Sequence, residues 1–339
     1  MLKSAINKLI EGKSLSEEEM IKSMDTIMEG NATDSQIGSF LTALRIKGET
    51  SEEITSGAKV MRDKLFKVDI GDKYAIDTCG TGGDGANTFN VSTIVAIIAS
   101  AAEVNILKHG NRSVSSKCGS ADVLESLGVN IELDPVMVKK CLKKINIGFM
   151  FAPLFHRAMR NVIVPRRELG IRTIFNLLGP LTNPALVKGQ VLGVFDEKLT
   201  KIMAETLKKL GTERAMVVHG LDGLDEITIT TKTKVSELKD NRISTYYITP
   251  SDFGLELGKT EDLIGGYPQE NAEIILNILK GEKGPRRDMV LLNAGAAIYI
   301  GGQANSLIEG IEKAKNTIDK GLALEKLNQF IRLSQELTV

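Results

Sequence analysis

The chain has 339 residues, which is enough for one large domain or two modest ones, and 42% of them are hydrophobic. Its 43 basic and 43 acidic residues give a formal net charge of +0, which argues against nucleic-acid partners and charged membrane surfaces but permits a local basic pocket. With no tryptophan and 5 tyrosines, aromatic platforms for single-stranded nucleic acids are not expected.

The cysteines and the apolar runs indicate a cytoplasmic protein. Cys79, Cys118 and Cys141 are too few and too scattered for a disulfide framework, and they lack C-x-x-C spacing. The longest apolar run, near 94–102, is too short to span a bilayer, and the first residues lack the apolar core of a signal peptide. We therefore expect no membrane partner.

The first 65 residues predict a series of helices. Ser16 with Glu19 and Thr50 with Glu53 have the spacing of capping boxes, and Gly48 is placed to end the helix between them. No strand pattern interrupts these segments. We therefore expect a small helical domain at the start of the chain.

Beyond residue 73, short β-rich runs alternate with helical stretches. Strands are expected at 74–77, 105–107, 148–151, 190–195, 215–218 and 244–249. Helices are expected at 93–102, 120–127, 135–145, 198–210, 268–280, 287–300 and 304–319, with one more at the end. This alternation predicts an α/β domain with a central, mainly parallel sheet flanked by helices, in which ligands bind beyond the carboxyl ends of the strands.

The first of these strands leads into a glycine-rich loop, AIDTCGTGGDGANTFNVST at 75–93. The loop contains G-x-G-x-x-G ending at Gly85, but the expected helix starts eight residues later, near Thr93, and the next strand ends in Lys108 where a dinucleotide site needs an acid. No lysine follows the glycines as a Walker A motif requires. We therefore disfavour a dinucleotide site.

The same loop has the properties of a different anion site. Glycines let backbone N–H groups approach an anion, and Ser92 and Thr93 add hydroxyls at a helix start. Asp84 is unusual there, because it repels a bare phosphate and needs a cation or a ligand hydroxyl as its partner. A plain glycine-rich turn remains the alternative.

The second strand is followed by a basic loop of small residues, KHGNRSVSSKCGSADVLESLG at 108–128. Lys108 and Arg112 supply charge for a diphosphate, and the serines and glycines supply hydroxyls and amides for its oxygens. Ser120 is placed to cap the following helix. A solvated basic loop is the alternative interpretation.

Two further segments carry charged residues that suggest chemistry. Asp225 and Glu226 follow a buried strand, and paired carboxylates suit Mg²⁺ when a diphosphate completes its coordination. The segment 151–184 contains His156 and Arg166, and an arginine there can bind a carboxylate through two hydrogen bonds. A solvated turn and a basic surface helix are the respective alternatives.

Together these motifs carry a resemblance to a known family. DTCGTGGDG, NVST, KHGNRSVSSKCGSADVLE, LGIRTIFNLLGPLTNP and GLDEIT, in that order over nearly the whole chain, resemble the anthranilate phosphoribosyltransferases, which are nucleoside phosphorylase-like phosphoribosyltransferases. The resemblance implies a helical domain at 1–70 with a returning segment near 165–185, and an α/β phosphoribosyl diphosphate-binding domain at 71–339. It also implies a homodimer formed through the helical domain.

The resemblance further implies a Mg²⁺-dependent pentosyltransferase of L-tryptophan biosynthesis. Such an enzyme transfers the 5-phosphoribosyl group from phosphoribosyl diphosphate to the amine of anthranilate and releases diphosphate. Because an aromatic amine is already a nucleophile, we expect no definite general base, and Lys108 with Mg²⁺ stabilises the leaving diphosphate. The number of Mg²⁺ ions, the binding order and the preferred aromatic acid stay open.

Carried over residue by residue, the resemblance assigns three sets of site residues. Phosphoribosyl diphosphate is implied at Gly80, Gly83, Asp84, Thr88, Asn90, Val91, Ser92, Thr93, Lys108, His109, Gly110, Asn111, Arg112, Ser113, Val114, Ser115, Ser116 and Ser120. Anthranilate is implied at Gly80, Asn111, His156 and Arg166, and Mg²⁺ at Ser92, Asp225 and Glu226.

One departure and two rival functions qualify this assignment. The family commonly reads His-Pro-Ala-Met-Lys where this chain has HRAMR at 156–160, which leaves the mouth of the anthranilate tunnel open to question. Pyrimidine nucleoside phosphorylases share a similar basic loop, but GTGGDG with NVST and the acid pair favour the transferase. A paralogue that uses another aromatic acid is the second rival.

Overall fold

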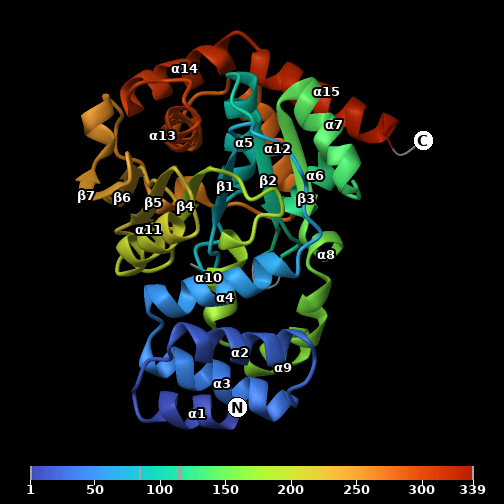
Figure 1. Cartoon of the computed structure of the whole chain (residues 1–339). Coiled ribbons are helices and arrows are strands. Elements are labelled where there is room, and N and C mark those ends of the chain that lie inside the picture. Colours follow the sequence, from blue (N-terminus) through green and yellow to red (C-terminus); the bar gives the residue numbers. More distant parts are fainter. Residues whose placement is uncertain (1, 84, 114–116, 338–339) are drawn as a thin grey trace.

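The computed structural model describes residues 2–83, 85–113 and 117–337 (Figure 1). The helices are α1 Leu2–Ile10, α2 Glu17–Met28, α3 Asp34–Lys47, α4 Ser51–Asp63, α5 Val91–Ala101, α6 Ser120–Ser126, α7 Pro135–Ile145, α8 Ala152–Phe155, α9 Ile163–Leu169, α10 Ile174–Leu181, α11 Leu199–Lys209, α12 Pro268–Leu279, α13 Pro285–Ile300, α14 Leu307–Asp319 and α15 Leu322–Glu336. The strands are β1 Ile76–Gly80, β2 Ile106–Gly110, β3 Ile147–Phe151, β4 Gly189–Gly193, β5 Arg214–Gly220, β6 Thr233–Lys239 and β7 Arg242–Ile248. Among the described residues, no helix is long and apolar enough to cross a membrane.

The amino-terminal helices begin and end where their capping residues predict. The Ser16 hydroxyl accepts from the Glu19 N–H at 3.3 Å, and the Glu19 carboxylate accepts from the Ser16 N–H at 2.7 Å. Thr50 and Glu53 form the same reciprocal pair at the start of α4. Gly48 ends α3 with a φ of +87°, a conformation that glycine adopts without strain. The predicted helical layer is therefore confirmed.

One seven-stranded sheet forms the centre of the larger part of the molecule. Its strand order is β3-β2-β1-β4-β5-β6-β7, in which the first five strands are parallel and β6 and β7 are antiparallel. Figure 1 shows α5 and α13 on one side of this sheet, with α14 and α15 beyond them. The predicted α/β fold with a mainly parallel sheet is confirmed.

Alternate residues of the central strands face two different cores. In β4, Val191 packs in the core that contains α5 and α13, whereas Leu192 packs in the core that contains α11 and the amino-terminal helices. Met216 and Val217 of β5 divide in the same way, because successive side chains of a strand point to opposite faces. The second core is thus shared between the sheet and the helical layer.

The chain returns to the helical layer between β3 and β4. Helix α9 lies against α3, and α10 lies against α4. Ile174, Leu178 and Leu181 of α10 are buried in the core of the amino-terminal helices. Residues far apart in the sequence therefore build one helical layer below the sheet in Figure 1.

Several element boundaries differ from those expected. Strands β1 and β2 extend three residues further, to Gly80 and Gly110, because each pairs with its neighbouring strand up to its last residue. Lys108 and His109 therefore lie within β2. Helix α5 begins at Val91, two residues earlier than expected.

The start of α6 also differs from the prediction. Gly119 occupies its N-cap position, so the expectation that Ser120 caps this helix is wrong. The reason is that the Asp122 carboxylate, in the first turn, accepts the Gly119 N–H at 2.8 Å.

Strand β6 was not expected from the sequence. Its residues, TKVSELK, place charged side chains between apolar ones, which obscures the alternation of a half-buried strand. The hairpin to β7 turns at Asp240 and Asn241, whose φ values are +49° and +58°. Those values are typical of a hairpin turn, but this pair lacks the glycine that usually signals one.

Candidate active site

Most of the predicted site residues that the structure describes lie at, or just after, the carboxyl ends of the parallel strands β1, β2 and β5. The chain passes from β1 outward to β2 and β3, and then returns to β4 on the other side of β1, so the order of the strands reverses there. Such a reversal leaves a crevice that commonly binds ligands. The loops after β1, β2 and β5 meet at this edge of the sheet.

Three strand-ending glycines allow these loops to approach closely. A Cβ on Gly80 would overlap the carboxylate of Asp225, and one on Gly193 would overlap the Asp225 backbone. A Cβ on Gly110 would overlap the hydroxyl of Ser120. Any larger residue would therefore push apart the segments that form the site.

Asp225 is docked on the glycine-rich loop. Its side chain is buried, and its Oδ2 accepts the N–H of Gly82 at 2.7 Å. Glu226 follows it and is half-buried. The connection between β5 and β6 thus places the predicted metal carboxylates against the predicted phosphate loop.

The donor set here fits a Mg²⁺ ion that a diphosphate helps to coordinate. Within the described ranges, no group of three His, Cys, Asp or Glu side chains is arranged to hold a metal by itself. Mg²⁺ is usually bound by one or two carboxylates together with substrate phosphates and water. Asp225, Glu226 and the Ser92 hydroxyl offer oxygens of the required kind.

The glycine-rich loop is held from the helical layer. Gly82, Gly83 and Gly85 have φ values of +65°, +75° and +75°, which explains the need for glycine at these positions. The Arg172 guanidinium donates to the carbonyl of Gly83 and lies 4.3 Å from the ring centroid of Phe195. Asp84 lies outside the described residues, and its partner, Mg²⁺ or ribose, stays a hypothesis.

The first turn of α5 presents fewer side chains to a ligand than expected. Val91 and Thr93 are each 1% exposed and face the core. The Ser92 hydroxyl instead accepts from Lys108 Nζ at 3.0 Å. Asn90, the N-cap residue, donates its side-chain N–H to the carbonyl of Cys118 at 3.2 Å, which ties this turn to the second loop.

Lys108 is a buried cation with a polar network near it. Its Nζ donates to the carbonyl of Thr78 as well as to Ser92, which leaves the third N–H for a ligand oxygen. Beneath it, Asp77 Oδ1 accepts the His109 N–H at 3.3 Å and Asp77 Oδ2 accepts from Asn183 at 2.8 Å. Burial raises the pKa of Asp77, and the Lys108 charge acts in the opposite direction.

The sequence patterns do not single out Asp77 and Asn183 as site residues. Asp77 lies inside an otherwise apolar strand, which is the signal that marks it. The pairing itself joins residues 106 positions apart, so no local pattern predicts it.

His109 and His156 form a neutral pair. Their Nε2 atoms are 2.9 Å apart, and their ring centroids are 4.7 Å apart with a 36° tilt between the planes. Burial lowers the pKa of His156 to about 4 and lowers the pKa of His109 well below its ordinary value. At neutral pH one ring therefore donates its N–H to the other, and the pair presents an uncharged aromatic surface.

The second loop is organised by its own acids. Arg112 Nη1 lies 3.1 Å from Asp122 and 2.8 Å from Glu125, and these bonds raise the pKa of the guanidinium. Asp122 also accepts the Ser113 N–H at 2.9 Å. These bonds use three of the five N–H groups of Arg112 and fix the orientation of its guanidinium.

The remaining residues predicted on this loop are placed as follows. Ser120 Oγ donates to the carbonyl of Asn111 at 3.4 Å, at the base of the loop. Val114, Ser115 and Ser116 lie outside the described residues. Thr88 forms a β-bridge with Ile264. It lies in the part of the glycine-rich loop that leads into α5, residues 87–89, which we call the far limb.

Arg166 lies on α9, which packs against α3 in the helical layer. Its guanidinium is half-buried and lies 5.2 Å from the ring centroid of Phe175. Burial lowers its pKa. No carboxylate within the described ranges forms an ion pair with it. A half-buried arginine without an acidic partner is suited to an anionic ligand.

Comparisons with known proteins point to one family. The family described as "Glycosyl transferase family, helical bundle domain" matches residues 3–65, and "Glycosyl transferase family, a/b domain" matches residues 72–324. The anthranilate phosphoribosyltransferase of Alkaliphilus metalliredigens is 66% identical over 339 residues, which is 100% of both chains. That of Acetivibrio thermocellus is 61% identical over 334 residues, or 98% of this chain and 97% of that protein.

Solved structures give the same result. Anthranilate phosphoribosyltransferase from Thermus thermophilus has a TM-score of 0.92 at 42% identity and covers 98% of this chain and 99% of its own. The Saccharomyces cerevisiae enzyme in complex with phosphoribosyl diphosphate and Mg has a TM-score of 0.89 at 31% identity, with 99% and 98% covered. The chain therefore belongs to the anthranilate phosphoribosyltransferases of the glycosyl transferase family.

Proposed function

We propose that the protein transfers the 5-phosphoribosyl group from phosphoribosyl diphosphate to the amine of anthranilate, giving N-(5-phosphoribosyl)anthranilate and diphosphate in L-tryptophan biosynthesis. The observation that carries this proposal is the 2.7 Å contact between Asp225 and Gly82. It brings the acid pair onto the glycine-rich loop, so that a diphosphate bound by the loop amides lies beside carboxylates suited to Mg²⁺.

Catalysis in this proposal depends on charge at the leaving group. As diphosphate leaves the anomeric carbon, negative charge develops on its oxygens and positive charge on the ribose. Lys108 is fixed by two acceptors and keeps one N–H for a leaving oxygen. Ser92, Asp225 and Glu226 would hold Mg²⁺, which supplies positive charge to the diphosphate when it is bound.

The other residues position the substrates. Asn90, the β2 end and the basic loop bind the phosphorylated sugar, and Arg166 binds the anthranilate carboxylate through its guanidinium. The neutral His109–His156 pair contacts the aromatic ring without a competing charge. Anthranilate is already a nucleophile, so positioning supplies much of the rate and no general base is required.

We also propose a cytoplasmic homodimer that associates through the helical layer at 1–70 and 165–185. Supporting features are two apolar side chains on that layer, Ile10 at 71% and Ile46 at 81% exposure. The structure describes all three cysteines, and none of them is in a disulfide, in keeping with a reducing compartment.

The direct test mixes the protein with Mg²⁺, phosphoribosyl diphosphate and anthranilate and follows anthranilate fluorescence. We expect the signal to fall with time and the rate to depend on Mg²⁺. Parallel reactions with other aromatic acids measure the preference among them. A constant signal together with phosphorolysis of thymidine would instead identify a pyrimidine nucleoside phosphorylase.

A further inference from the structure

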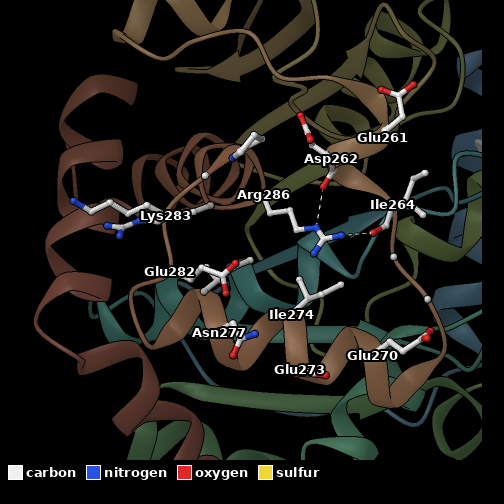
Figure 2. A pocket seen from close by; sticks show the side chains of 16 residues that line it. Glu261, Asp262, Ile264, Glu270, Glu273, Ile274, Asn277, Glu282, Lys283 and Arg286 are labelled. Atoms are coloured by element: carbon white, nitrogen blue, oxygen red, sulfur yellow. Dashed lines mark hydrogen bonds between the residues drawn. The ribbon is translucent and has the colours of Figure 1, made fainter.

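A cavity of about 660 Å³ lies beside the candidate active site, between residues 261–266, helix α12 and the start of α13. Figure 2 shows Arg286 extending across this cavity toward residues 262 and 264. We call residues 262–266 the strap. The strap separates the cavity from the glycine-rich loop, so the contacts on its two sides decide what it does.

On the cavity side, one arginine fixes the strap. Arg286 Nε donates to the carbonyl of Asp262 at 2.8 Å, and Arg286 Nη2 donates to the carbonyl of Ile264 at 2.9 Å (Figure 2). Two hydrogen bonds from one planar guanidinium set both the position and the orientation of the strap backbone. The arginine comes from the first turn of α13, which is packed firmly in the main core.

On the other side, the strap pairs with the far limb of the glycine-rich loop. The N–H of Phe89 donates to the carbonyl of Leu263 at 3.3 Å, and the N–H of Gly265 donates to the carbonyl of Asn87 at 2.9 Å. A Cβ on Gly265 would overlap the Phe89 backbone, so glycine is required for this approach. The strap therefore acts as a short antiparallel partner for the segment that leads into α5.

Asn271 joins the strap to both predicted phosphate loops. It is 1% exposed and lies in the first turns of α12. Its Oδ1 accepts the N–H of Gly266 at 2.7 Å, and its Nδ2 donates to Asn90 Oδ1 at 2.9 Å. Because only the oxygen can accept from Gly266, this bond fixes the orientation of the amide. Asn90 in turn donates to Cys118 in the second loop.

We propose that Asn271 and Arg286 are positioning residues for phosphoribosyl diphosphate. Through the strap they fix the far limb of the glycine-rich loop, and through Asn90 they set its spacing from the second loop. Neither residue is among those implied to bind the substrates. This inference rests on the proposed function, because it assumes that the two loops bind the diphosphate sugar.

The sharpest test is Asn271→Asp. The aspartate keeps an oxygen for the Gly266 N–H but loses the donor to Asn90, so the strap stays attached while the link to α5 is broken. We expect the KM for phosphoribosyl diphosphate to rise about tenfold, the effect of losing about 1.4 kcal/mol. The KM for anthranilate, measured at saturating phosphoribosyl diphosphate, should change by less than about twofold on the same scale.

Two further variants complete the test. Arg286→Gln removes the fork that holds the strap and should also raise the KM for phosphoribosyl diphosphate selectively. Asn277→Asp is the matched control, because it is the same substitution on the same helix, at a residue that lines the cavity (Figure 2). This control should behave like the wild-type protein.

The outcomes separate this inference from the proposed function. Calorimetry measures the affinity for phosphoribosyl diphosphate with Mg²⁺ in the absence of anthranilate. If the wild-type protein binds phosphoribosyl diphosphate but does not turn over anthranilate, the proposed acceptor is refuted. The affinities of the variants for phosphoribosyl diphosphate would still test the positioning role. If Asn271→Asp leaves the affinity for phosphoribosyl diphosphate unchanged, or raises the KM values for both substrates equally, the positioning role is overturned. If Asn271→Asp does not fold, the Arg286→Gln result decides by the same criterion.

Discussion

Lys108 lies in the middle of β2 and is only 3% exposed. Replacing it with methionine keeps most of the volume and removes the charge that we propose to act on the leaving diphosphate. We expect Lys108→Met to lower kcat by about 100-fold to 1000-fold, the range seen when one preorganised electrostatic donor is lost. Steady-state kinetics at saturating substrates measure this effect. Retention of near-wild-type kcat would show that the ammonium does not act on the transition state.

Arg166 gives a second prediction at the scale of one side chain. Arg166→Ala should raise the KM for anthranilate far more than the KM for phosphoribosyl diphosphate, because only the aromatic acid carries the carboxylate that we propose Arg166 to bind. The neighbouring Arg167 is exposed and serves as the matched control. Equal effects of Arg166→Ala on the two KM values would contradict the assignment.

The histidine pair predicts a pH dependence of stability. In the unfolded chain both histidines take up protons near pH 6.5, whereas folded His156 does so only near its pKa of about 4. The unfolded chain therefore binds more protons in this window, and the free energy of unfolding falls as the pH is lowered from about 6.5 to about 4. Carboxylates also titrate near pH 4, so the wild-type protein alone does not isolate the effect of the histidines. The informative comparison is therefore with a histidine variant.

His156→Gln removes one titrating group and should make the loss of stability with falling pH shallower. Urea unfolding at several pH values across the window measures the slope. Identical slopes for the two proteins would mean that the pair does not stay neutral in the folded state.

Residue types in the site could be predicted from the sequence, but their connections could not. Glycines, hydroxyls and cations at strand ends indicated phosphate chemistry, because each type has a local reason to be there. The Asp77–Asn183 pair and the Asn271–Asn90 pair join residues 106 and 181 positions apart. Only the folded arrangement brings such partners together.

Among the secondary-structure elements, α4 offers the clearest test of stability. Glu53 is fully buried, caps α4, accepts the N–H of Leu15 at 2.9 Å and pairs with Lys47 at 2.6 Å. Glu53→Ala leaves a buried ammonium without its partner, and we expect a loss of about 3–5 kcal/mol in the free energy of unfolding.

The control for this experiment lies one residue earlier. Glu52 is exposed and pairs with Lys209 on the surface, so Glu52→Ala should cost less than about 1 kcal/mol. Urea unfolding compares the two variants. Similar losses would show that the buried pair gives no more stability than a surface one.

Helices and central strands could be predicted closely, whereas strand ends could not. A helix carries its stop signals within its own sequence, as Gly48 does for α3. Strands β1 and β2 end where their neighbours stop pairing, which is a property of the sheet. Strand β6 was not predicted for a related reason. It is buried by its contacts with β5 and α11, and its own sequence has no apolar run.

At the scale of the whole molecule, the helical layer predicts the state of association. If the proposed dimer forms through Ile10 and Ile46, two glutamates at these positions would bury charge in the interface. Ile10→Glu with Ile46→Glu should then sediment as a monomer under conditions where the wild-type protein sediments as a dimer. A monomeric wild-type protein, or a doubly substituted dimer, would exclude this interface.

The shared core also has a consequence for synthesis and cleavage. The chain crosses between the helical layer and the sheet after α4, again after β3 and a third time before β4. The helices made first on the ribosome can pack against one another, but their buried contacts with α10 and α11 form only after those helices have emerged. Once the protein is folded, a protease that cuts a single crossing leaves the two parts joined by the others.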